Sequence, residues 1–310
     1  MTTSIWFWVA FHIGVFVAIG VDLITFKRRD RELSMRAAAR RSALWVVVSL
    51  AFNALVWRIK GPHHGVDFFT AYLVEYSLSA DNIFVFVLIF SHFRVPPKAQ
   101  HRVLVWGILG ALVMRGTMIL CGIALVRRFH VVLYLFGFLL VVTAFRMLFG
   151  RHAPRDFPEG WVMRVCHRVL PISREFYDDH FKVRMDGRWM LTPLALTMIV
   201  IELTDLAFAI DSIPAVFAIT QDPFIAYTSN ICAILGLRSL YFLLAGLMER
   251  FVYLRTGLAL VLGFVGVKMM IADYVRLPRS LSLGIITLIL TVTITISMLK
   301  TRRDPQPRAK

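Results

Sequence analysis

The chain has 310 residues, of which 58% are hydrophobic and only 17% are charged, and its mean hydropathy is +0.70. Soluble domains carry about 25% charged residues and disordered chains lack apolar surface, so this composition excludes both classes. The formal net charge is +16, which in a membrane protein is typical of basic cytoplasmic loops and requires no nucleic-acid partner. The cysteines Cys121, Cys166 and Cys232 are too few for a disulfide framework.

Nine apolar segments are long enough to cross a bilayer, because one span needs about 20 residues. The sequence therefore predicts an all-α, polytopic membrane helix bundle that forms one integral membrane domain over residues 1–310. The first segment has no basic residue before it and a basic cluster after it, the reverse of a cleaved secretory signal. The segments are residues 5–26, 40–57, 66–91, 102–126, 129–149, 192–219, 223–247, 252–273 and 281–299.

The basic residues are distributed unevenly between the two sides of the membrane. Seven lie between Lys27 and Arg41, and if that side is the cytoplasm, 25 of the 35 Lys and Arg are cytoplasmic and six are outside. The positive-inside rule then predicts an outside N-terminus, a cytoplasmic C-terminus and an odd number of spans. We expect the protein to lie in the inner membrane of the cell.

The one long loop is the predicted cytoplasmic connector, residues 150–191. Residues 180–191 alternate around Asp186-Gly187, which is a two-residue hairpin signal. The stretch from Trp161 to Leu170 is compatible with an amphipathic helix on the membrane surface. The alternative interpretation of the connector is a solvated basic linker.

An internal repeat links the two halves of the chain. Glu75-YSLSA-Asp81-Asn82-Ile matches Asp205-LAFAI-Asp211-Ser212-Ile, and further landmarks follow in the same order: Arg115 with Arg238, Arg128-Phe with Arg250-Phe, and Arg146-Met with Lys268-Met. The repeat units cover residues 66–149 and 192–273. Because each unit holds three predicted spans, the second copy is expected upside down, an arrangement that many transporters share.

Five acidic residues lie well inside the predicted third and sixth spans, and Asp22 lies near the cytoplasmic end of the first. A charged side chain at the centre of a span costs about 2.5–3.5 kcal/mol, so five would cost roughly 12–18 kcal/mol unless they were paired or protonated. One alternative is structural, with Arg115 and Arg238 forming ion pairs that lock the bundle. The other is a cation site, a proton relay, or both, because acids outnumber the central arginines. The five acids are Glu75, Asp81, Glu202, Asp205 and Asp211.

The residues around these acids indicate a hard divalent cation. Asn82, Ser79 and Ser212 add oxygen donors, and neither motif contains Cys or His, which favours Mg²⁺, Ca²⁺ or Mn²⁺ over Cu⁺ or Zn²⁺. A six-residue offset places the two acids of one motif about 120° apart around a straight helix. Their convergence requires local unwinding, which we expect in SLSADN and near Pro214.

Several weaker features have plainer explanations. His63-His64 is expected in an outer loop, where a solvated pair is favoured over a metal site, and His12 is expected to be a hydrogen-bonded core histidine. No HExxH, GxSxG or Walker motif occurs, so nothing predicts a hydrolase or a nucleotide-driven pump, and we expect no enzymatic activity.

At these motifs the sequence resembles the TerC family of integral membrane proteins, named for tellurium resistance and including Alx-type members. The resemblance covers most of residues 66–271, with a weaker likeness through the first span. One departure from the family pattern is Tyr76, where many members have Lys. The stretches that carry the resemblance are YLVEYSLSADNIFVFVLIFSHFRVP, TPLALTMIVIELTDLAFAIDSIPAVFAIT, TSNICAILGLRSLYFLLAGL and GVKMM.

The resemblance implies manganese export from the cytoplasm and resistance to metal or tellurite. It implies that Glu75, Asp81, Asp205 and Asp211 bind the metal and couple it to protons. Asn82 and Ser212 would complete the shell, and Arg115 and Arg238 would balance charge in the empty site. Mn²⁺ is thus expected as a transported substrate, not as a cofactor.

Two rival hypotheses belong to other functional classes. One is a membrane scaffold or stress-complex component whose carboxylates are structural. The other is an oxyanion transporter, which predicts more bases than acids at the midplane, whereas this sequence has the opposite balance.

Overall fold

A computed structural model describes residues 4–27, 35–129, 131–149, 171, 173, 177, 180–185, 188–245, 253–275 and 277–303. Helices dominate these residues, with one two-stranded sheet. The helices are α1 (Ile5–Lys27), α2 (Met35–Lys60), α3 (Pro62–His92), α4 (Pro97–Arg128), α5 (Val131–Phe149), α7 (Pro193–Phe217), α8 (Pro223–Leu235), α9 (Leu237–Ala245), α10 (Leu254–Met270) and α11 (Arg279–Arg303). The strands are β1 (Lys182–Met185) and β2 (Arg188–Leu191).

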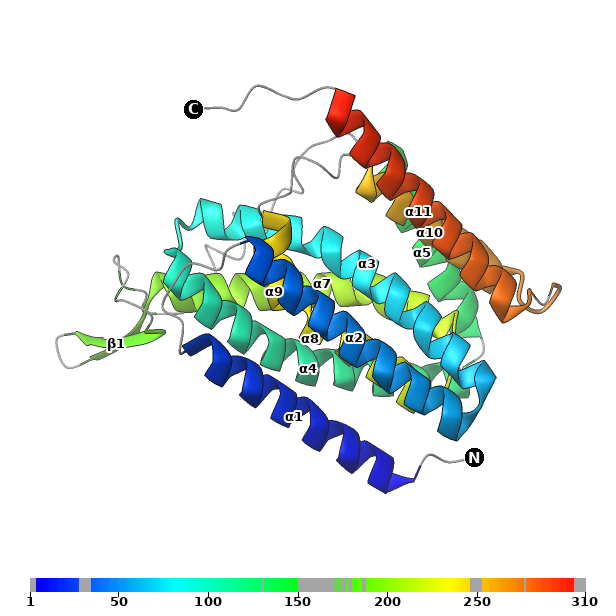
Figure 1. Cartoon of the computed structure of the whole chain (residues 1–310), viewed down its shortest axis with the longest axis horizontal. Coiled ribbons are helices and arrows are strands. Elements are labelled where there is room, and N and C mark those ends of the chain that lie inside the picture. Colours follow the sequence, from blue (N-terminus) through cyan, green and yellow to red (C-terminus); the bar gives the residue numbers. More distant parts are fainter. Residues whose placement is uncertain are drawn as a thin grey trace.

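The helices form one elongated bundle, with α5, α10 and α11 grouped along one side (Figure 1). The start of α1 and the turn between α2 and α3 lie at one end of this bundle, and the β-hairpin lies at the other (Figure 1). The helix α10 packs along α5, where a Cβ on Gly137 would come within 3.0 Å of the Gly266 carbonyl oxygen. Small residues at such crossings let helix backbones approach closely within a membrane.

The protein is a polytopic α-helical membrane protein. Seven of the described helices are long and apolar enough to cross a bilayer, and an eighth candidate is the bent pair α8–α9. The remaining predicted segment, residues 252–273, forms α10, an apolar helix of only 17 residues. The described helices therefore support seven or eight spans, and the ninth span stays a prediction, as does the inverted repeat.

Several helix starts follow from local sequence. Proline occupies the first position of α3, α4, α7 and α8, where its missing N–H is not needed and its fixed φ suits a helix. Gly61, with φ of 95°, makes the tight turn between α2 and α3, a conformation that other residues rarely adopt.

Two predicted helix features are wrong. The expected unwinding in SLSADN is absent, since α3 is continuous from Pro62 to His92 and the Ser77 hydroxyl donates to Leu73 O at 2.7 Å within the helix. The helix α7 also continues through Pro214 and ends three residues later at Phe217, although Pro214 has no N–H to donate to the preceding turn. The bend falls instead at Gly236, where α8 and α9 meet at 43° within the segment predicted as one span.

The predicted hairpin is confirmed. The strands pair antiparallel with Met185 opposite Arg188, which leaves Asp186-Gly187 as a two-residue connection. That dipeptide and the predicted amphipathic stretch from Trp161 to Leu170 lie outside the described residues.

Candidate functional site

Three charged side chains from three helices form an ion-pair cluster inside the bundle. Arg115 of α4 donates from Nε to Asp205 Oδ2 at 3.0 Å and from Nη2 to Asp205 Oδ1 at 2.8 Å. Its Nη1 donates to Glu75 Oε1. The paired bonds to Asp205 are bidentate, which fixes the orientation of the two groups as well as their distance. Because Glu75 lies on α3 and Asp205 on α7, one guanidinium connects three helices.

This Glu75–Arg115–Asp205 cluster is closed off from the surface. The side chains of Arg115 and Glu75 are 0% exposed and that of Asp205 is 7% exposed. Two carboxylates share one guanidinium, so the ionised cluster carries one negative charge in excess. Among the residues that the structure describes, the second carboxylate oxygen of Glu75, Oε2, has no hydrogen-bond partner. A buried carboxylate oxygen without a partner is available as a ligand for a cation.

Further side chains with oxygen atoms suited to binding a cation lie on the same helix faces as Glu75 and Asp205. Ser79 and Asn82 follow Glu75 on α3 by four and seven residues, and Ser212 follows Asp205 on α7 by seven. Residues with this spacing share one face of a helix. All three are buried, and the hydroxyls of Ser79 and Ser212 have no hydrogen-bond partner in the described part of the chain. Each helix thus carries an acid followed by uncharged oxygen donors.

The metal site predicted on four carboxylates is described only in part. The structure brings Glu75 and Asp205 to the same guanidinium, whereas the side chains of Asp81 and Asp211 lie outside the described part of α3 and α7. Among the side chains that are described, no three His, Cys, Asp or Glu groups are arranged to hold a metal ion. The role of these four carboxylates as metal ligands stays a prediction.

Glu202 lies against α4 beside the cluster. A Cβ added to Gly110 would lie 2.3 Å from Glu202 Oε1, whereas a Cβ on Gly107, one turn earlier, would lie 3.8 Å from the same atom. The absence of a side chain at Gly110 therefore makes room for the Glu202 carboxylate. Glu202 precedes Asp205 by three residues on α7, so the two acids lie on neighbouring positions of one face.

The second central arginine pairs with the first helix. Arg238 of α9 donates from Nη2 to Asp22 Oδ2 of α1, and these side chains are 4% and 19% exposed. At Arg115, the first acids of the two motifs converge on one guanidinium. At Arg238 the partner that the structure describes is Asp22.

His12 is hydrogen-bonded, as predicted, but it is only partly buried. Its Nδ1 lies 2.8 Å from Trp8 O and its Nε2 lies 2.9 Å from the Tyr227 hydroxyl. This contact joins α1 to α8 and leaves His12 with partners on both ring nitrogens.

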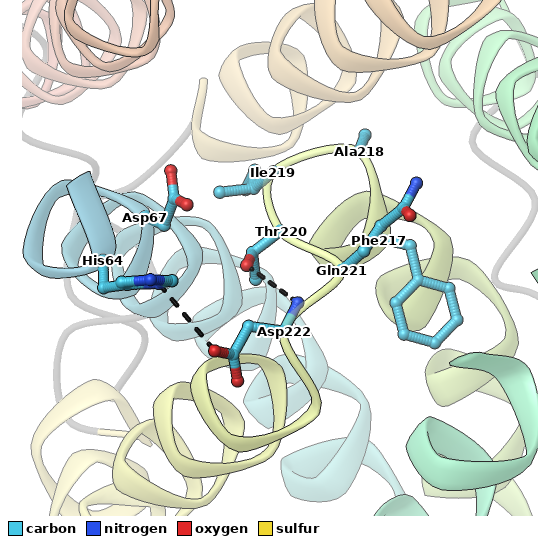
Figure 2. Close-up of a pocket in the computed structure, with 8 residues that line it drawn as sticks. All are labelled: His64, Asp67, Phe217, Ala218, Ile219, Thr220, Gln221 and Asp222. Carbon is cyan, nitrogen blue, oxygen red and sulfur yellow. Dashed lines mark hydrogen bonds and ion pairs between the residues drawn. The ribbon is translucent and has the colours of Figure 1, made fainter. Parts of the chain in front are cut away.

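A cavity of about 340 Å³ lies at the bundle end that holds the α2–α3 turn. Figure 2 shows it between the first turns of α3 and the connection from α7 to α8, with the His64 ring directed at the Asp222 carboxylate. The His64 Nδ1 and Asp222 Oδ2 are 3.8 Å apart, and Lys60 Nζ contacts the same oxygen at 2.6 Å. His63 and His64 belong to the first turn of α3, so their prediction as loop residues is wrong.

Asp222 connects this cavity to the start of α8. Its Oδ1 accepts hydrogen bonds from Phe224 N at 2.9 Å and Ile225 N at 3.2 Å, which caps the helix. Burial opposes ionisation of the Asp222 carboxyl, but the Lys60 ammonium and the two backbone N–H groups outweigh it and hold its pKa below the usual value. Asp222 therefore stays ionised over the physiological range.

Sequence reasoning missed two features of the site region. The Lys60–Asp222 pair joins the end of α2 to the start of α8. These residues are far apart in the chain, so no local sequence pattern predicts the pair. Asn230 of α8 is completely buried, and neither its Nδ2 nor its Oδ1 has a hydrogen-bond partner among the described residues. The sequence does contain a signal for Asn230, because burying an amide within an apolar segment costs free energy unless the amide has hydrogen-bond partners.

Comparison with known proteins identifies the family. The model described as "Integral membrane protein TerC family" matches residues 60–305. This chain belongs to the TerC family. The match confirms the resemblance seen in the motifs and extends it beyond residues 66–271 to include α11.

Relatives of this TerC-family chain match it over nearly its whole length. An uncharacterized membrane protein of Myxococcus xanthus is 46% identical over 298 residues, which are 96% of this chain and 93% of that protein. A Salmonella typhi protein named "Putative membrane-bound redox modulator Alx" is 42% identical over 313 residues, covering 98% of this chain and 97% of its own. An uncharacterized membrane protein of Rickettsia bellii is 37% identical over 292 residues, 94% of each chain. No solved structure matches.

Proposed function

We propose that this TerC-family protein exports a divalent cation, Mn²⁺ in the first place, from the cytoplasm in exchange for protons. The observation that carries the proposal is the buried cluster in which Glu75 and Asp205 share Arg115. It is buried, has an excess of negative charge, and joins the two motifs of the proposed inverted repeat. A purely structural ion pair would need only one acid for its arginine.

The cluster suggests how binding and release would alternate. Without metal, Arg115 neutralises one of the two acids and holds both in place. A divalent cation that reached Glu75 Oε2 would be attracted by that uncommitted oxygen and repelled by the guanidinium. Binding would therefore displace Arg115 from at least one carboxylate, and a proton arriving at that carboxylate would favour release of the metal.

The donor chemistry supports a hard cation. Glu75, Ser79, Asn82, Asp205 and Ser212 provide carboxylate, hydroxyl and amide oxygens, which suit Mg²⁺, Ca²⁺ and Mn²⁺. The choice of manganese rests on the family resemblance, and resistance to metal or tellurite would follow from export. Asp81, Asp211 and Glu202 are proposed as further acidic groups of the pathway.

The proposal includes the membrane arrangement on which exchange depends. It comprises nine spans, an outside N-terminus, a cytoplasmic C-terminus, and inverted units at residues 66–149 and 192–273 around a cytoplasmic connector at 150–191. The lipid bilayer, the metal ion and protons are the proposed partners, and neither nucleic acid nor an enzymatic reaction is part of the function. An effect on redox state, which the Alx name states for those relatives, would follow from an altered metal content.

A structural role is the second candidate, and a specific observation favours it. The arginines Arg115 and Arg238 both have carboxylate partners, so the described charges already stabilise the bundle without a metal ion. In this alternative the protein is a membrane scaffold or a stress-complex component. The structural alternative predicts that loss of an ion pair lowers the amount of folded protein and has no separate effect on the cellular metal content.

Cellular manganese content distinguishes the two candidates. Cells that make the protein should hold less manganese during manganese excess, and survive it better, than cells that make Glu75→Gln. This variant removes the excess charge but leaves Arg115 its bidentate bonds to Asp205. Equal manganese content with wild type and variant, at equal membrane abundance, would favour the scaffold.

A further inference from the structure

Asn230 is a buried polar residue that the ion-pair cluster does not explain. It lies in α8, is 0% exposed, and has no hydrogen-bond partner at either Nδ2 or Oδ1 among the described residues. An amide normally makes several hydrogen bonds when buried, and leaving it without them lowers stability. An apolar side chain of similar size would be better suited to a purely structural role at this position.

Helix geometry places Asn230 on the side of α8 that meets α4. The ring of Tyr227 lies against α4 at Gly116, the residue that follows Arg115 in the chain, because a Cβ on Gly116 would be 2.8 Å from Tyr227 Cε2. Asn230 follows Tyr227 by three residues, so it lies one turn further along α8 and about 60° around its axis. The helix α8 also packs against α3, which carries Glu75.

Uncommitted oxygen atoms are present on the facing helix α3. Glu75 Oε2 and Ser79 Oγ have no hydrogen-bond partner, and both residues are 0% exposed. This absence of partners refers to the described part of the chain. Glu75 and Ser79 lie one turn apart on the same face of α3, and the other Glu75 oxygen contacts Arg115. Three buried groups on two packed helices thus have oxygen atoms that no described residue uses.

We propose that Asn230 Oδ1 is a ligand of the transported divalent cation, together with Glu75 Oε2 and Ser79 Oγ. This inference rests on the proposed export function and adds a neutral ligand to it. Amide and hydroxyl oxygens coordinate hard cations without adding negative charge. Asn230 therefore sets affinity and the preference for hard cations, whereas the carboxylates carry the coupling to protons.

The test is direct binding of Mn²⁺ to the purified full-length protein in detergent, measured by the loss of the free Mn²⁺ electron paramagnetic resonance signal. Asn230→Leu should weaken binding by about 10–100-fold, the range seen when groups that support a metal site are removed. Its Tm without metal should equal or exceed that of the wild type, because a buried unpaired amide is removed. Asn53→Leu is the matched control, since Asn53 of α2 also has a side-chain oxygen without a partner among the described residues. The affinity of this variant should be unchanged.

A second pair of variants removes the dependence on one substitution. Asn230→Ser and Asn230→Ala differ by one oxygen atom, and the serine variant should bind Mn²⁺ more tightly than the alanine variant. Wild-type affinity in Asn230→Leu, or equal affinities of the serine and alanine variants, would overturn the inference while leaving the export proposal intact. If the wild-type protein binds no Mn²⁺, the export proposal fails and the inference fails with it.

Discussion

Glu75 of α3 and Asp205 of α7 occupy matching positions of two similar motifs and contact the same guanidinium, that of Arg115. Each motif therefore contributes its first acid to one buried cluster. In the described structure the arginine lies between the acids, so the charge that a cation would need is largely neutralised. Movement of Arg115 relative to Glu75 is the change that would make this cluster able to bind a cation.

Arg115 is expected to be essential for folding. Arg115→Gln removes the only neutralising charge of the cluster that the structure describes and leaves two buried acids, which should destabilise the protein by about 3–5 kcal/mol. Arg146→Gln, an exposed change in α5, is the control and should have little effect. Thermal unfolding in detergent and membrane abundance measure both variants. Equal stability of the two variants would contradict a structural contribution from Arg115.

The second acids of the motifs are expected to matter for transport and not for abundance. Asp81→Asn and Asp211→Asn keep the side-chain size and remove one negative charge each, so each should abolish manganese efflux at normal membrane abundance. Adding Arg115→Gln or Arg238→Gln should not restore efflux. If both single variants export manganese normally, neither residue belongs to the site. If they accumulate poorly and the second change restores them, their role is to pair with an arginine.

Two glycines of α4 test the contact with Glu202. Gly107→Ala should stabilise the protein by about 0.5–1 kcal/mol, because alanine favours a helix and its Cβ fits. Gly110→Ala gains the same helix preference but must displace the Glu202 carboxylate, whose Oε1 would be 2.3 Å from the new atom. We expect Gly110→Ala to lower manganese efflux relative to Gly107→Ala. The same efflux from both would show that the position of Glu202 does not matter.

The Asp222 cap predicts a pH dependence of stability. The pKa of Asp222 is lowered in the folded protein, so its contribution is complete above the unfolded pKa of about 3.9 and is lost as pH falls through the lower folded pKa. Asp222→Ala removes the cap and the bond to Lys60, and should cost about 0.5–2 kcal/mol near pH 7 from the cap alone. Asp222→Asn keeps an oxygen for the cap and should cost less.

Thermal unfolding of these variants from pH 3 to pH 7 measures the effect. The difference between wild type and Asp222→Ala should shrink toward acidic pH. A difference that stays constant over this range would rule out the ionised carboxylate as its source.

The general architecture could be predicted from the sequence because it depends on local chemistry. Apolar length identified the spanning helices, and Asp186-Gly187 identified the hairpin. The bend at Gly236 could not be predicted, because a glycine within an apolar helix is compatible with a straight or a bent path. The prediction of unwinding near Pro214 was wrong, because α7 continues through the proline and ends at Phe217.

The candidate site was predicted in its residues but not in its pairing. Burial cost alone identified Glu75, Asp205 and Arg115, since charges inside spans need partners. The sharing of one arginine by acids from two helices depends on how α3, α4 and α7 pack, which no local pattern encodes. The burial cost of a charge does not identify Asn230, because its amide is neutral, although it is buried as deeply as Glu75 and Arg115.

The most direct measurement of the central claim is Mn²⁺ flux through the purified protein in liposomes that contain a Mn²⁺-sensitive dye. With an imposed proton gradient, wild-type protein should carry Mn²⁺ against the direction of proton flow, and collapsing the gradient should slow it. Glu75→Gln, reconstituted at equal density, should lose this flux while keeping its thermal stability. Wild-type liposomes that carry no more Mn²⁺ than protein-free liposomes, with or without the gradient, would contradict the account.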